Sequence, residues 1–257
     1  MRQVTPSAGV VLAPNPGPMT LEGTNTWVLR EPGHPDVVVV DPGPLDEGHL
    51  QAVVATGNVA LIVLTHGHHD HSAGAQRLHD LTGADVVSLD PTFTIGGAAL
   101  TRDGESFGAA GVTLTVVHTP GHSSDSLSLH LEDDDAVLTG DTILGRGTTV
   151  VAHPDGVLAD YLRSLHRLEE YGAATVLPGH GPELPHAGEV AACYLAHRAQ
   201  RLEQVRAAVA AGASTPREVV ETVYADVDPS LWVAAELSVR AQLDYLRAPG
   251  PVPADGR

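Results

Sequence analysis

The chain has 257 residues, of which 42% are hydrophobic and 18% charged, a composition typical of a globular protein and not of a disordered or fibrous one. Its 32 acidic residues outnumber 14 basic ones, all of them Arg, and the formal net charge of −18 disfavours binding to double-stranded DNA and to anionic membranes. The lack of Lys excludes Schiff-base chemistry, and a single cysteine, Cys193, excludes an internal disulfide. We find neither a signal peptide nor an apolar run long enough to span a membrane, which predicts a cytoplasmic protein.

Short β-branched runs alternate with amphipathic helical stretches over residues 1–187, which indicates an α/β domain. Near-continuous apolar runs at 36–41 and 58–66 predict strands that are covered on both faces. A short helix is predicted at 72–83, where Gly83 ends it. The remaining predicted elements are strands at 112–119, 126–131 and within 132–141, a helix at 158–172, and a strand at 174–180.

Residues 188–257 follow a helical pattern only, and we predict that they form a small C-terminal module resembling a truncated winged helix. Its first helix is predicted at about 190–211, and its third begins after Asp228. The second helix has an N-cap, a first-turn proline and a capping-box glutamate, namely Thr215, Pro216 and Glu218. The prolines at 249, 251 and 253 argue against a paired β wing after the third helix.

Residues of two metal-binding types, His and Asp, gather in THGHHDHS (65–72), where a predicted buried strand gives way to a helix. His66, His68, Asp70 and His71 form an H-x-H-x-D-H pattern there, and a turn can point several of these side chains into one cavity. Imidazole and carboxylate suit zinc and related divalent ions, so this segment predicts a metal site. The ordinary alternative is an exposed histidine-rich turn.

Three later segments share one arrangement, in which a strand ends in Gly and a possible metal ligand follows. They contribute His122 in TPGHSS, Asp141 in LTGDT and His180 in LPGHGP. Each glycine is expected to let the backbone turn tightly as it leaves the sheet. A lone Gly-His or a strand-end Asp means little, but the ordered set strengthens the prediction of a metal site.

With these motifs, the sequence resembles the metallo-β-lactamase superfamily. The resemblance implies an αββα sandwich with a binuclear site at one edge of two sheets. It further implies that His66, His68 and His122 bind one metal, that Asp70, His71 and His180 bind the other, and that Asp141 bridges both. The resemblance extends to GTNTWVL (23–29), VVDPGP (39–44), GDTILGRGTTV (140–150) and HRAQRLEQV (197–205), segments similar to the subgroup named after beta-lactamase-like protein 2.

This donor set predicts hydrolytic chemistry. Two divalent metal ions held by five imidazoles and two carboxylates, most simply zinc but also manganese or iron, leave a net positive site that attracts anionic or carbonyl-bearing substrates. Such ions lower the pKa of a bound water toward about 7 and supply hydroxide at neutral pH. We expect Asp70 to orient that hydroxide and act as the catalytic residue.

The sequence leaves the substrate open between a phosphodiester and a thioester. The only cysteine, Cys193, lies in the tail and not among the ligands, which argues against antibiotic hydrolysis as the main role. The subgroup resemblance implies cleavage of single-stranded RNA, which we slightly favour, while relatives with the same ligand pattern hydrolyse small-molecule esters or thioesters. Arg146, Thr148 and Thr149 are predicted to hold a phosphate, although the negative charge and the few aromatic residues argue against RNA.

Other polar residues have two interpretations each. Arg198, Arg201 and Arg206 extend the track for a phosphate backbone, or they form a solvated helix face paired with Glu203 and its neighbours. Asn25 contacts the substrate or stabilises a turn.

A hypothesis from another functional class is a non-hydrolytic module, either a metal-bearing redox scaffold or a binding protein whose tail docks a partner. The tail also suggests a possible homodimer. A redox relative would usually carry a flavin domain, and the 257 residues leave no room for one.

Overall fold

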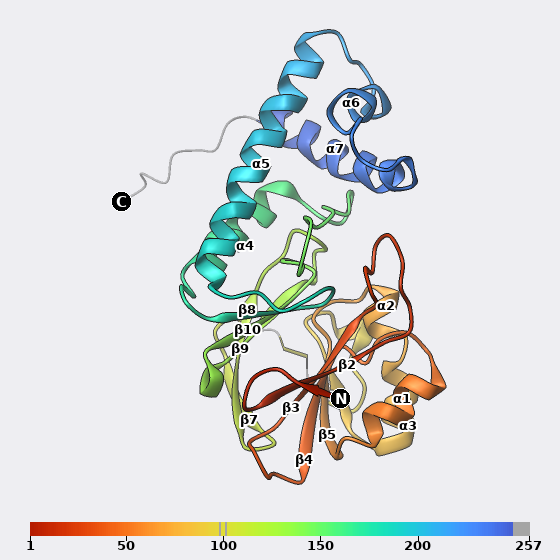
Figure 1. Cartoon of the computed structure of the whole chain (residues 1–257), viewed down its shortest axis with the longest axis vertical. Coiled ribbons are helices and arrows are strands. Elements are labelled where there is room, and N and C mark those ends of the chain that lie inside the picture. Colours follow the sequence, from red (N-terminus) through yellow and green to blue (C-terminus); the bar gives the residue numbers. More distant parts are fainter. Residues whose placement is uncertain (98, 101, 249–257) are drawn as a thin grey trace.

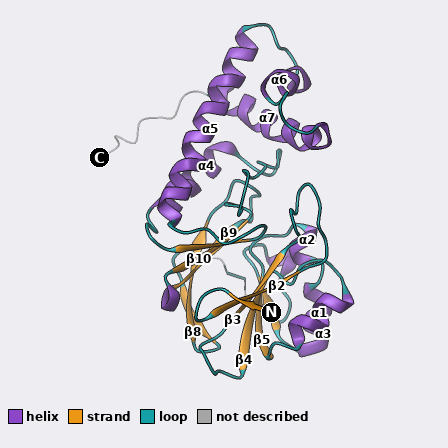
Figure 2. Ribbon diagram, viewed as in Figure 1, coloured by secondary structure: helices purple, strands orange, loops and turns teal. Residues whose placement is uncertain are grey.

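A computed structural model describes residues 1–97, 99–100 and 102–248 of the chain. Two β-sheets pack face to face, and helices cover the outer face of each sheet, with further helices extending above the sandwich (Figure 1). Figure 2 shows the same division into a mixed sandwich and an all-helical end. The predicted αββα sandwich with a helical C-terminal module is therefore confirmed.

The first sheet has six strands in the order in which they occur along the chain. They are β1 (Arg2–Gln3), β2 (Ala8–Leu12), β3 (Asn25–Leu29), β4 (Asp36–Val40), β5 (Asn58–Val63) and β6 (Asp85–Val87). The strands from β1 to β4 pair antiparallel, whereas β4, β5 and β6 pair in parallel. The carboxyl ends of β4 and β5 therefore lie at the same edge of the sheet.

The second sheet has five strands in the order β11-β10-β9-β8-β7. They are β7 (Ser106–Ala109), β8 (Val112–His118), β9 (Leu127–Leu131), β10 (Ala136–Gly140) and β11 (Thr175–Pro178). Both β8 and β10 are antiparallel to β9, and β11 is parallel to β10. The strands β8, β10 and β11 thus run in one direction, and their carboxyl ends share an edge.

The alternation of side chains along β4 shows how the sequence builds three layers. Val38 and Val40 face the core between the two sheets, while Val37 and Val39 face the helices on the outside. A strand covered on both faces needs apolar residues at every position, which is why the sequence of β4 is an almost uninterrupted apolar run. The outer cover consists of α1 (Glu47–Val54) and α3 (Ala75–Thr82), and the short α2 (His69–Ser72) precedes α3.

The opposite face of the sandwich is covered by α4 (Leu158–Glu169) and the first half of α5 (Ala187–Ala210). Tyr161, Leu165 and Tyr194 are buried in this cluster against the second sheet. Short 3₁₀ helices lie at Pro91–Phe93 and Glu132–Asp134. The predicted helix at 158–172 and the predicted strands on either side of it are present with slightly shorter bounds.

The C-terminal helices form a small core of their own. The second half of α5 packs with α6 (Pro216–Val223) and α7 (Trp232–Arg247), which follows a 3₁₀ turn at Pro229–Leu231, and the buried residues include Val205, Val220 and Val239. The capping box between Thr215 and Glu218 is present as predicted. The boundary predicted between 187 and 188 falls in the first turn of α5. This one helix packs against the core of the sandwich and against the core of the C-terminal helices.

Among the described residues beyond 188, the structure contains helices only. The predicted lack of a β wing concerns residues 249–257, which lie outside the described residues. None of the described helices combines the length and the apolar character needed to cross a bilayer.

Candidate metal centre

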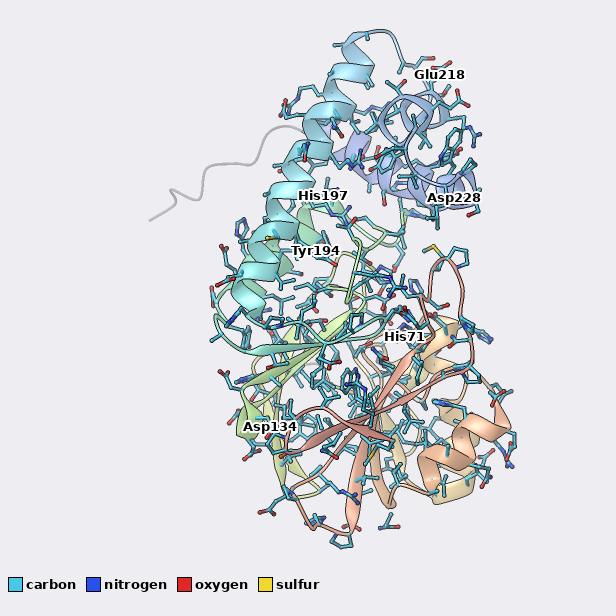
Figure 3. The ribbon with its side chains drawn as sticks, in the orientation of Figure 1. His71, Asp134, Tyr194, His197, Glu218 and Asp228 are labelled. Atoms are coloured by element: carbon cyan, nitrogen blue, oxygen red, sulfur yellow. The ribbon has the colours of Figure 1, made fainter. Side chains whose placement is uncertain are left out.

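Two sheet edges meet where the candidate ligands lie. β5 leads into the segment with His66, His68, Asp70 and His71, while the ends of β8, β10 and β11 lead to the other three. The structure brings all seven predicted side chains into one cluster. Figure 3 shows one of them, His71, at the edge of the sandwich that faces the C-terminal helices. The cluster comprises His66, His68, Asp70, His71, His122, Asp141 and His180.

The first group of donors consists of three imidazoles. His68 Nδ1 lies 3.1 Å from His66 Nε2 and 2.9 Å from His122 Nε2. One donor atom from each of the three residues lies within 4.8 Å of the others. This spacing allows one cation to contact all three nitrogens.

The second group is Asp70, His71 and His180. His180 Nε2 lies 3.1 Å from His71 Nε2 and 3.1 Å from Asp70 Oδ2. Asp141 lies between the two groups, with Oδ1 3.3 Å from His71 Nε2 and Oδ2 3.7 Å from His122 Nε2. Its two oxygens thus face different groups of donors.

The second ring nitrogen of several of these histidines fixes which nitrogen faces the cluster. His122 Nδ1 lies 2.7 Å from the carbonyl oxygen of Val150, and His180 Nδ1 lies 3.2 Å from that of Gly23. A carbonyl only accepts, so these Nδ1 atoms carry the proton and donate it. The Nε2 lone pairs are therefore left free to bind a cation in the cluster.

Asp41, at the end of β4, orients His71 in the same way. Its Oδ2 lies 2.8 Å from His71 Nδ1, while its two carboxylate oxygens accept from the amide and the hydroxyl of Thr65 at 2.8 and 2.7 Å. Asp41 is 1% exposed and has a φ of 53°, a left-handed conformation that Asp tolerates better than most residues. Sequence analysis gave this residue no role, although it follows an apolar strand as Asp141 does.

The charges in the cluster shift the pKa values in opposite directions. Burial opposes the charged form of His71, but Asp141 and Asp41 outweigh it and hold its pKa well above the usual value. Burial likewise opposes the charged form of His180, yet Asp141 and Asp70 raise its pKa to about 9. Burial and the neighbouring charge of His71 hold the pKa of His66 well below its usual value.

Asp141 has the complementary shift. Burial favours its neutral form, but the positive charges of His71 and His180 outweigh burial and hold its pKa well below the usual value. The ionised carboxylates thus favour positive charge at this place, whether protons or metal cations carry it.

Two observations test whether these residues fit metal ions. Asp141 Oδ1 is buried and has no hydrogen-bond partner among the described residues. Nε2 atoms whose lone pairs face each other, such as those of His71 and His180, would repel unless a proton or a cation lay between them. Both features, with imidazole and carboxylate donors only, fit a pair of divalent cations of the zinc, manganese or iron type.

The glycines before these residues act in two ways. Gly121 and Gly140 have φ values of 134° and 48°, so they provide the turns that the sequence predicted. Gly179 has no such conformation. A Cβ there would lie 2.6 Å from Asp141 Oδ1 and 2.8 Å from His71 Cε1, so Gly179 is required because it leaves space for the donors.

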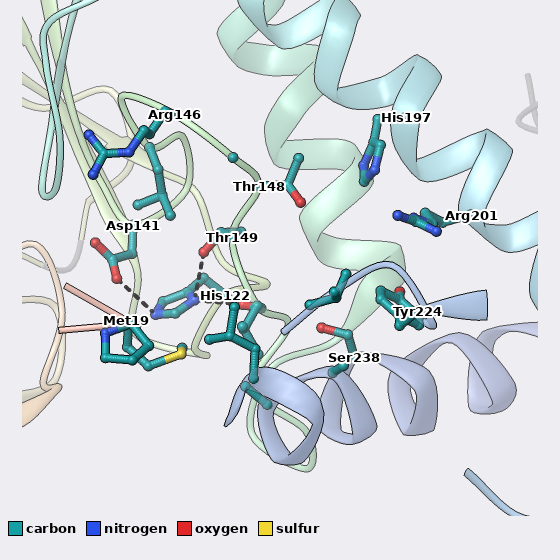
Figure 4. Close-up of a pocket in the computed structure, with 18 of the residues that line it drawn as sticks. Met19, His122, Asp141, Arg146, Thr148, Thr149, His197, Arg201, Tyr224 and Ser238 are labelled. Carbon is teal, nitrogen blue, oxygen red and sulfur yellow. Dashed lines mark hydrogen bonds and ion pairs between the residues drawn. The ribbon is translucent and has the colours of Figure 1, made fainter. Parts of the chain in front are cut away.

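A cavity of about 320 Å³ opens beside the cluster, between the sandwich and the C-terminal helices (Figure 4). His122 and Asp141 form one end of it, and the wall is mainly apolar. Its apolar lining residues are Pro18, Met19, Leu21, Leu144, Val150, Val227, Leu231, Ala234 and Ala235. Its polar lining includes Thr148, Thr149, His197, Arg198, Arg201, Tyr224 and Ser238.

The predicted substrate contacts have different surroundings. Thr148 and Thr149 line the cavity, but the Thr149 hydroxyl lies 3.2 Å from His122 Nδ1 and supports that ring. Arg146 also lines it, yet its exposed guanidinium is paired with Glu22. The Asn25 amide is buried and donates to the carbonyls of Pro178 and Gly181, so it holds the segment that carries His180.

The three arginines of α5 also separate. Arg206 forms the ion pair with Glu203 that the ordinary interpretation expected. Arg198 is not part of a solvated face, because it is 4% exposed, donates to the carbonyl of Thr149 and lies over the ring of Tyr161. Arg201 donates to the carbonyl of Val223 and lies 4.7 Å from the ring centroid of Tyr224.

Comparison with protein families gives two matches. A model described as the metallo-beta-lactamase superfamily matches residues 19–180, and one described as a beta-lactamase associated winged helix domain matches residues 215–257. A beta-lactamase-like protein 2 homolog from Caenorhabditis elegans is 32% identical over 94% of this chain and 84% of its own length. An atrochrysone carboxyl ACP thioesterase from Aspergillus fumigatus is 30% identical over 86% of this chain and 74% of its own.

Solved structures show the same architecture. The crystal structure of a metallo-beta-lactamase family protein from Thermus thermophilus has a TM-score of 0.80 and 24% identity, and the match covers 94% of this chain and 93% of that one. A beta-lactamase domain protein from Burkholderia ambifaria also has a TM-score of 0.80 at 24% identity, covering 95% and 86%. The C-terminal helices are thus included in the shared fold.

Proposed function

The chain belongs to the metallo-β-lactamase superfamily of hydrolases, and from this premise we propose that it is a binuclear metal-dependent enzyme that hydrolyses an acyl thioester. The observation that carries the choice of substrate is the cavity beside the cluster. An acyl chain needs an apolar wall next to the reacting groups, and His122 and Asp141 open directly onto such a wall. The relative named atrochrysone carboxyl ACP thioesterase supports the same choice.

We assign His66, His68 and His122 to one cation, Asp70, His71 and His180 to the other, and Asp141 to both. The distances within each group and the position of Asp141 between them support this assignment. When bound, two such cations supply hydroxide at neutral pH and positive charge for the oxygen of a carbonyl group.

The residues of the chain then do the positioning. Asp70 is the more exposed of the two carboxylates in the cluster, because 31% of its side-chain surface is accessible to solvent. Its Oδ2 lies 3.1 Å from His180 Nε2. We assign to Asp70 the role of accepting a hydrogen bond from the attacking water and so orienting it. Water adds to the thioester carbonyl, the carbon–sulfur bond breaks, and the products are a carboxylate and a thiol.

Cleavage of single-stranded RNA is the second candidate. Thr148, His197 and Arg201 on the cavity wall are groups that can hold a phosphate, which is the observation in its favour. The cationic track expected for RNA is interrupted, because Arg146 and Arg206 are each paired with a glutamate. The apolar wall also offers few aromatic rings on which bases would stack.

A substrate panel tests the proposal. We expect metal-loaded protein to hydrolyse an acyl-pantetheine thioester, and chelation or the Asp70→Ala and His71→Ala substitutions to lower the rate by more than about 100-fold. The matched control is His69→Ala, because His69 lies in the same segment but is exposed and outside the cluster. Full activity in metal-free protein contradicts the metal assignment.

The other arms of the panel separate the alternatives. Turnover of single-stranded RNA with no turnover of any thioester contradicts the proposed substrate and favours the second candidate. Two irons by metal analysis, with a reversible redox signal and no hydrolysis, favours the non-hydrolytic hypothesis.

A further inference from the structure

Two arginines beside the cavity lack the acidic partner that most arginines of this acidic chain have. The arginines that lie within 4.0 Å of a carboxylate oxygen are Arg2, Arg77, Arg146, Arg163, Arg167, Arg206, Arg217, Arg240 and Arg247. Among residues 1–97, 99–100 and 102–248, no ion pair is formed by Arg198 or Arg201, which both line the cavity. Arg30 and Arg102 also lack one, but they lie away from the cavity.

Arg198 is the more unusual of the two, since a buried charge normally has an opposite charge nearby. It is 4% exposed, and its contacts are a carbonyl oxygen and the face of Tyr161, which are both uncharged. Its Nε has no hydrogen-bond partner among the described residues. The buried guanidinium thus keeps an unused donor and an uncompensated charge.

Arg201, one helical turn further along α5, is in a similar state. It uses only Nη1 in hydrogen bonds, to the Val223 carbonyl and the Gln204 side chain, and these acceptors are neutral. The rest of the guanidinium lies by the ring of Tyr224. Figure 4 shows Arg201 and His197 projecting from α5 toward the cavity.

His197 reports on this environment. Its Nδ1 is buried and unpaired among the residues that the structure describes. Burial lowers the pKa of His197, and the charges of Arg198 and Arg201 lower it further. Since neither arginine forms an ion pair within the described residues, the positive charge of the cavity wall formed by His197, Arg198 and Arg201 is not neutralised by a neighbouring carboxylate there.

The wall is also close to the reacting groups. Arg198 donates to the carbonyl oxygen of Thr149, whose hydroxyl lies 3.2 Å from His122 Nδ1. The apolar residues Val227 and Leu231 line the same cavity. A ligand that extends from the metal cluster along this wall therefore meets apolar surface and two free cationic groups.

We propose that Arg198 and Arg201, together with His197, form an anion-binding site for a carboxylate or phosphate carried by the substrate. This inference rests on the proposed thioester hydrolysis and narrows it to substrates in which a negatively charged group lies beyond an apolar segment. A carboxylate would come from the acyl side of the thioester and a phosphate from the thiol side, as in a phosphopantetheine.

Matched substrate pairs distinguish these sources. On the acyl side, glutaryl and butyryl thioesters of N-acetylcysteamine differ by a carboxylate. On the thiol side, butyryl-phosphopantetheine and butyryl-pantetheine differ by a phosphate. We expect the charged member of one pair to have a lower KM, and Arg201→Gln to raise that KM by about tenfold or more, a much larger rise than for the neutral member.

The control is Arg206→Gln, which removes an arginine from the same helix but outside this cavity. Arg201→Lys, which keeps the charge, should restore part of the affinity. Equal KM values within both pairs, or an equal effect of Arg201→Gln on charged and neutral substrates, overturns the proposal.

A binding measurement keeps the inference separate from the proposed reaction. In the metal-loaded protein, NMR titration of His197, identified with a His197→Gln variant, should show a higher pKa when glutarate or phosphopantetheine is present. This rise should be absent in Arg201→Gln and retained in Arg206→Gln. If no thioester is hydrolysed but His197 responds, the proposed function fails and the anion site stands.

Two further outcomes decide against the site as proposed. If neither anion changes the pKa of His197, no anion binds at this wall. If single-stranded RNA binds and only its binding is lost in Arg201→Gln, the arginines contact a nucleic-acid phosphate and not a small acyl substrate.

Discussion

The metal cluster and the cavity wall that contains His197, Arg198 and Arg201 differ in how many of their polar side-chain atoms have hydrogen-bond partners. In the cluster, His71, His122 and His180 each have one ring nitrogen held by a carboxylate or a carbonyl. In the wall, buried atoms of His197 and Arg198 lack partners among the described residues. Contacts within the chain thus orient the cluster, whereas the wall has unused donors for a ligand. We infer that the residues for the reaction and the residues for substrate recognition are separate.

The two regions also differ in how the fold positions them. The cluster residues follow strand ends of two sheets whose registers are fixed by buried alternating side chains. The wall comes from α5 and α7, and α5 belongs to both hydrophobic cores. Changes in the cluster should therefore alter metal binding, while changes in the wall should alter substrate affinity.

The largest effect on the metal cluster is expected for Gly179→Ala. The added methyl group would lie 2.6 Å from Asp141 Oδ1, although the backbone at this position is not strained. We expect a folded protein with less bound metal and an activity reduced by more than about 100-fold. Metal content by elemental analysis and circular dichroism would measure both.

The matched control for that change is Gly48→Ala in α1, where the new methyl would meet only the Asp46 side chain at 3.4 Å. This substitution should leave activity intact and slightly raise stability, because Ala favours a helix over Gly. Full metal content in Gly179→Ala would show that the donors tolerate a shift.

The next largest effect is expected for Asp41→Asn, which keeps the shape and tolerates the left-handed backbone. An Asn amide in place of Oδ2 would point a donor at His71 Nδ1, so the ring would have to place its proton on Nε2, toward the cluster. We expect metal affinity to fall by about 10- to 100-fold. The control is Asp46→Asn, since Asn is an equally good cap for α1; equal affinity in both variants would contradict the role of Asp41.

Sequence reasoning identified the cluster residues because their types are rare in combination and their spacing follows strand ends. The apolar runs predicted an α/β domain, and the family resemblance implied the αββα sandwich. The assignment of individual ligands to two cations stays a prediction. The role of Gly179 was misjudged because a short contact between distant segments, here with Asp141, cannot be read from a local pattern.

Recognition was less predictable than chemistry for a physical reason. Arg146 and Arg198 are equally charged in the sequence, yet one pairs with a glutamate 124 residues away and the other is buried without an acidic partner in the described structure. The apolar cavity is likewise made by residues from distant segments, such as Leu144 and Leu231. Only tertiary packing decides which charges stay free.

A pH experiment tests whether the cluster, and not the wall, has the acid-rich electrostatics expected of a metal site. The pKa of His180 is raised to about 9 in the folded chain. Protonation therefore stabilises the metal-free fold fully below about pH 6.5, and this stabilisation is lost as pH rises through about 9. We expect the metal-free protein to lose on the order of 3 kcal/mol of stability across this window.

Bound cations replace those protons, so the metal-loaded protein should change little over the same window. The gap in melting temperature between the two forms should accordingly widen from pH 6.5 to 9. Parallel melting curves for the two forms would contradict the shared role of protons and metal at His180.

The smallest effect is expected for Tyr194→Phe, which loosens the wall without touching the cluster. The Tyr194 hydroxyl accepts from the Leu144 amide at 3.0 Å and donates to the Leu144 carbonyl at 3.1 Å, so its removal leaves both backbone groups unpaired. We expect a loss of about 1–3 kcal/mol in unfolding free energy, a higher KM and unchanged metal content. Tyr171→Phe is the control, because the Tyr171 side chain packs against the same core but its hydroxyl forms no hydrogen bond within the described residues. An altered metal content in Tyr194→Phe would mean that α5 supports the cluster as well as the cavity, and that chemistry and recognition are not separate.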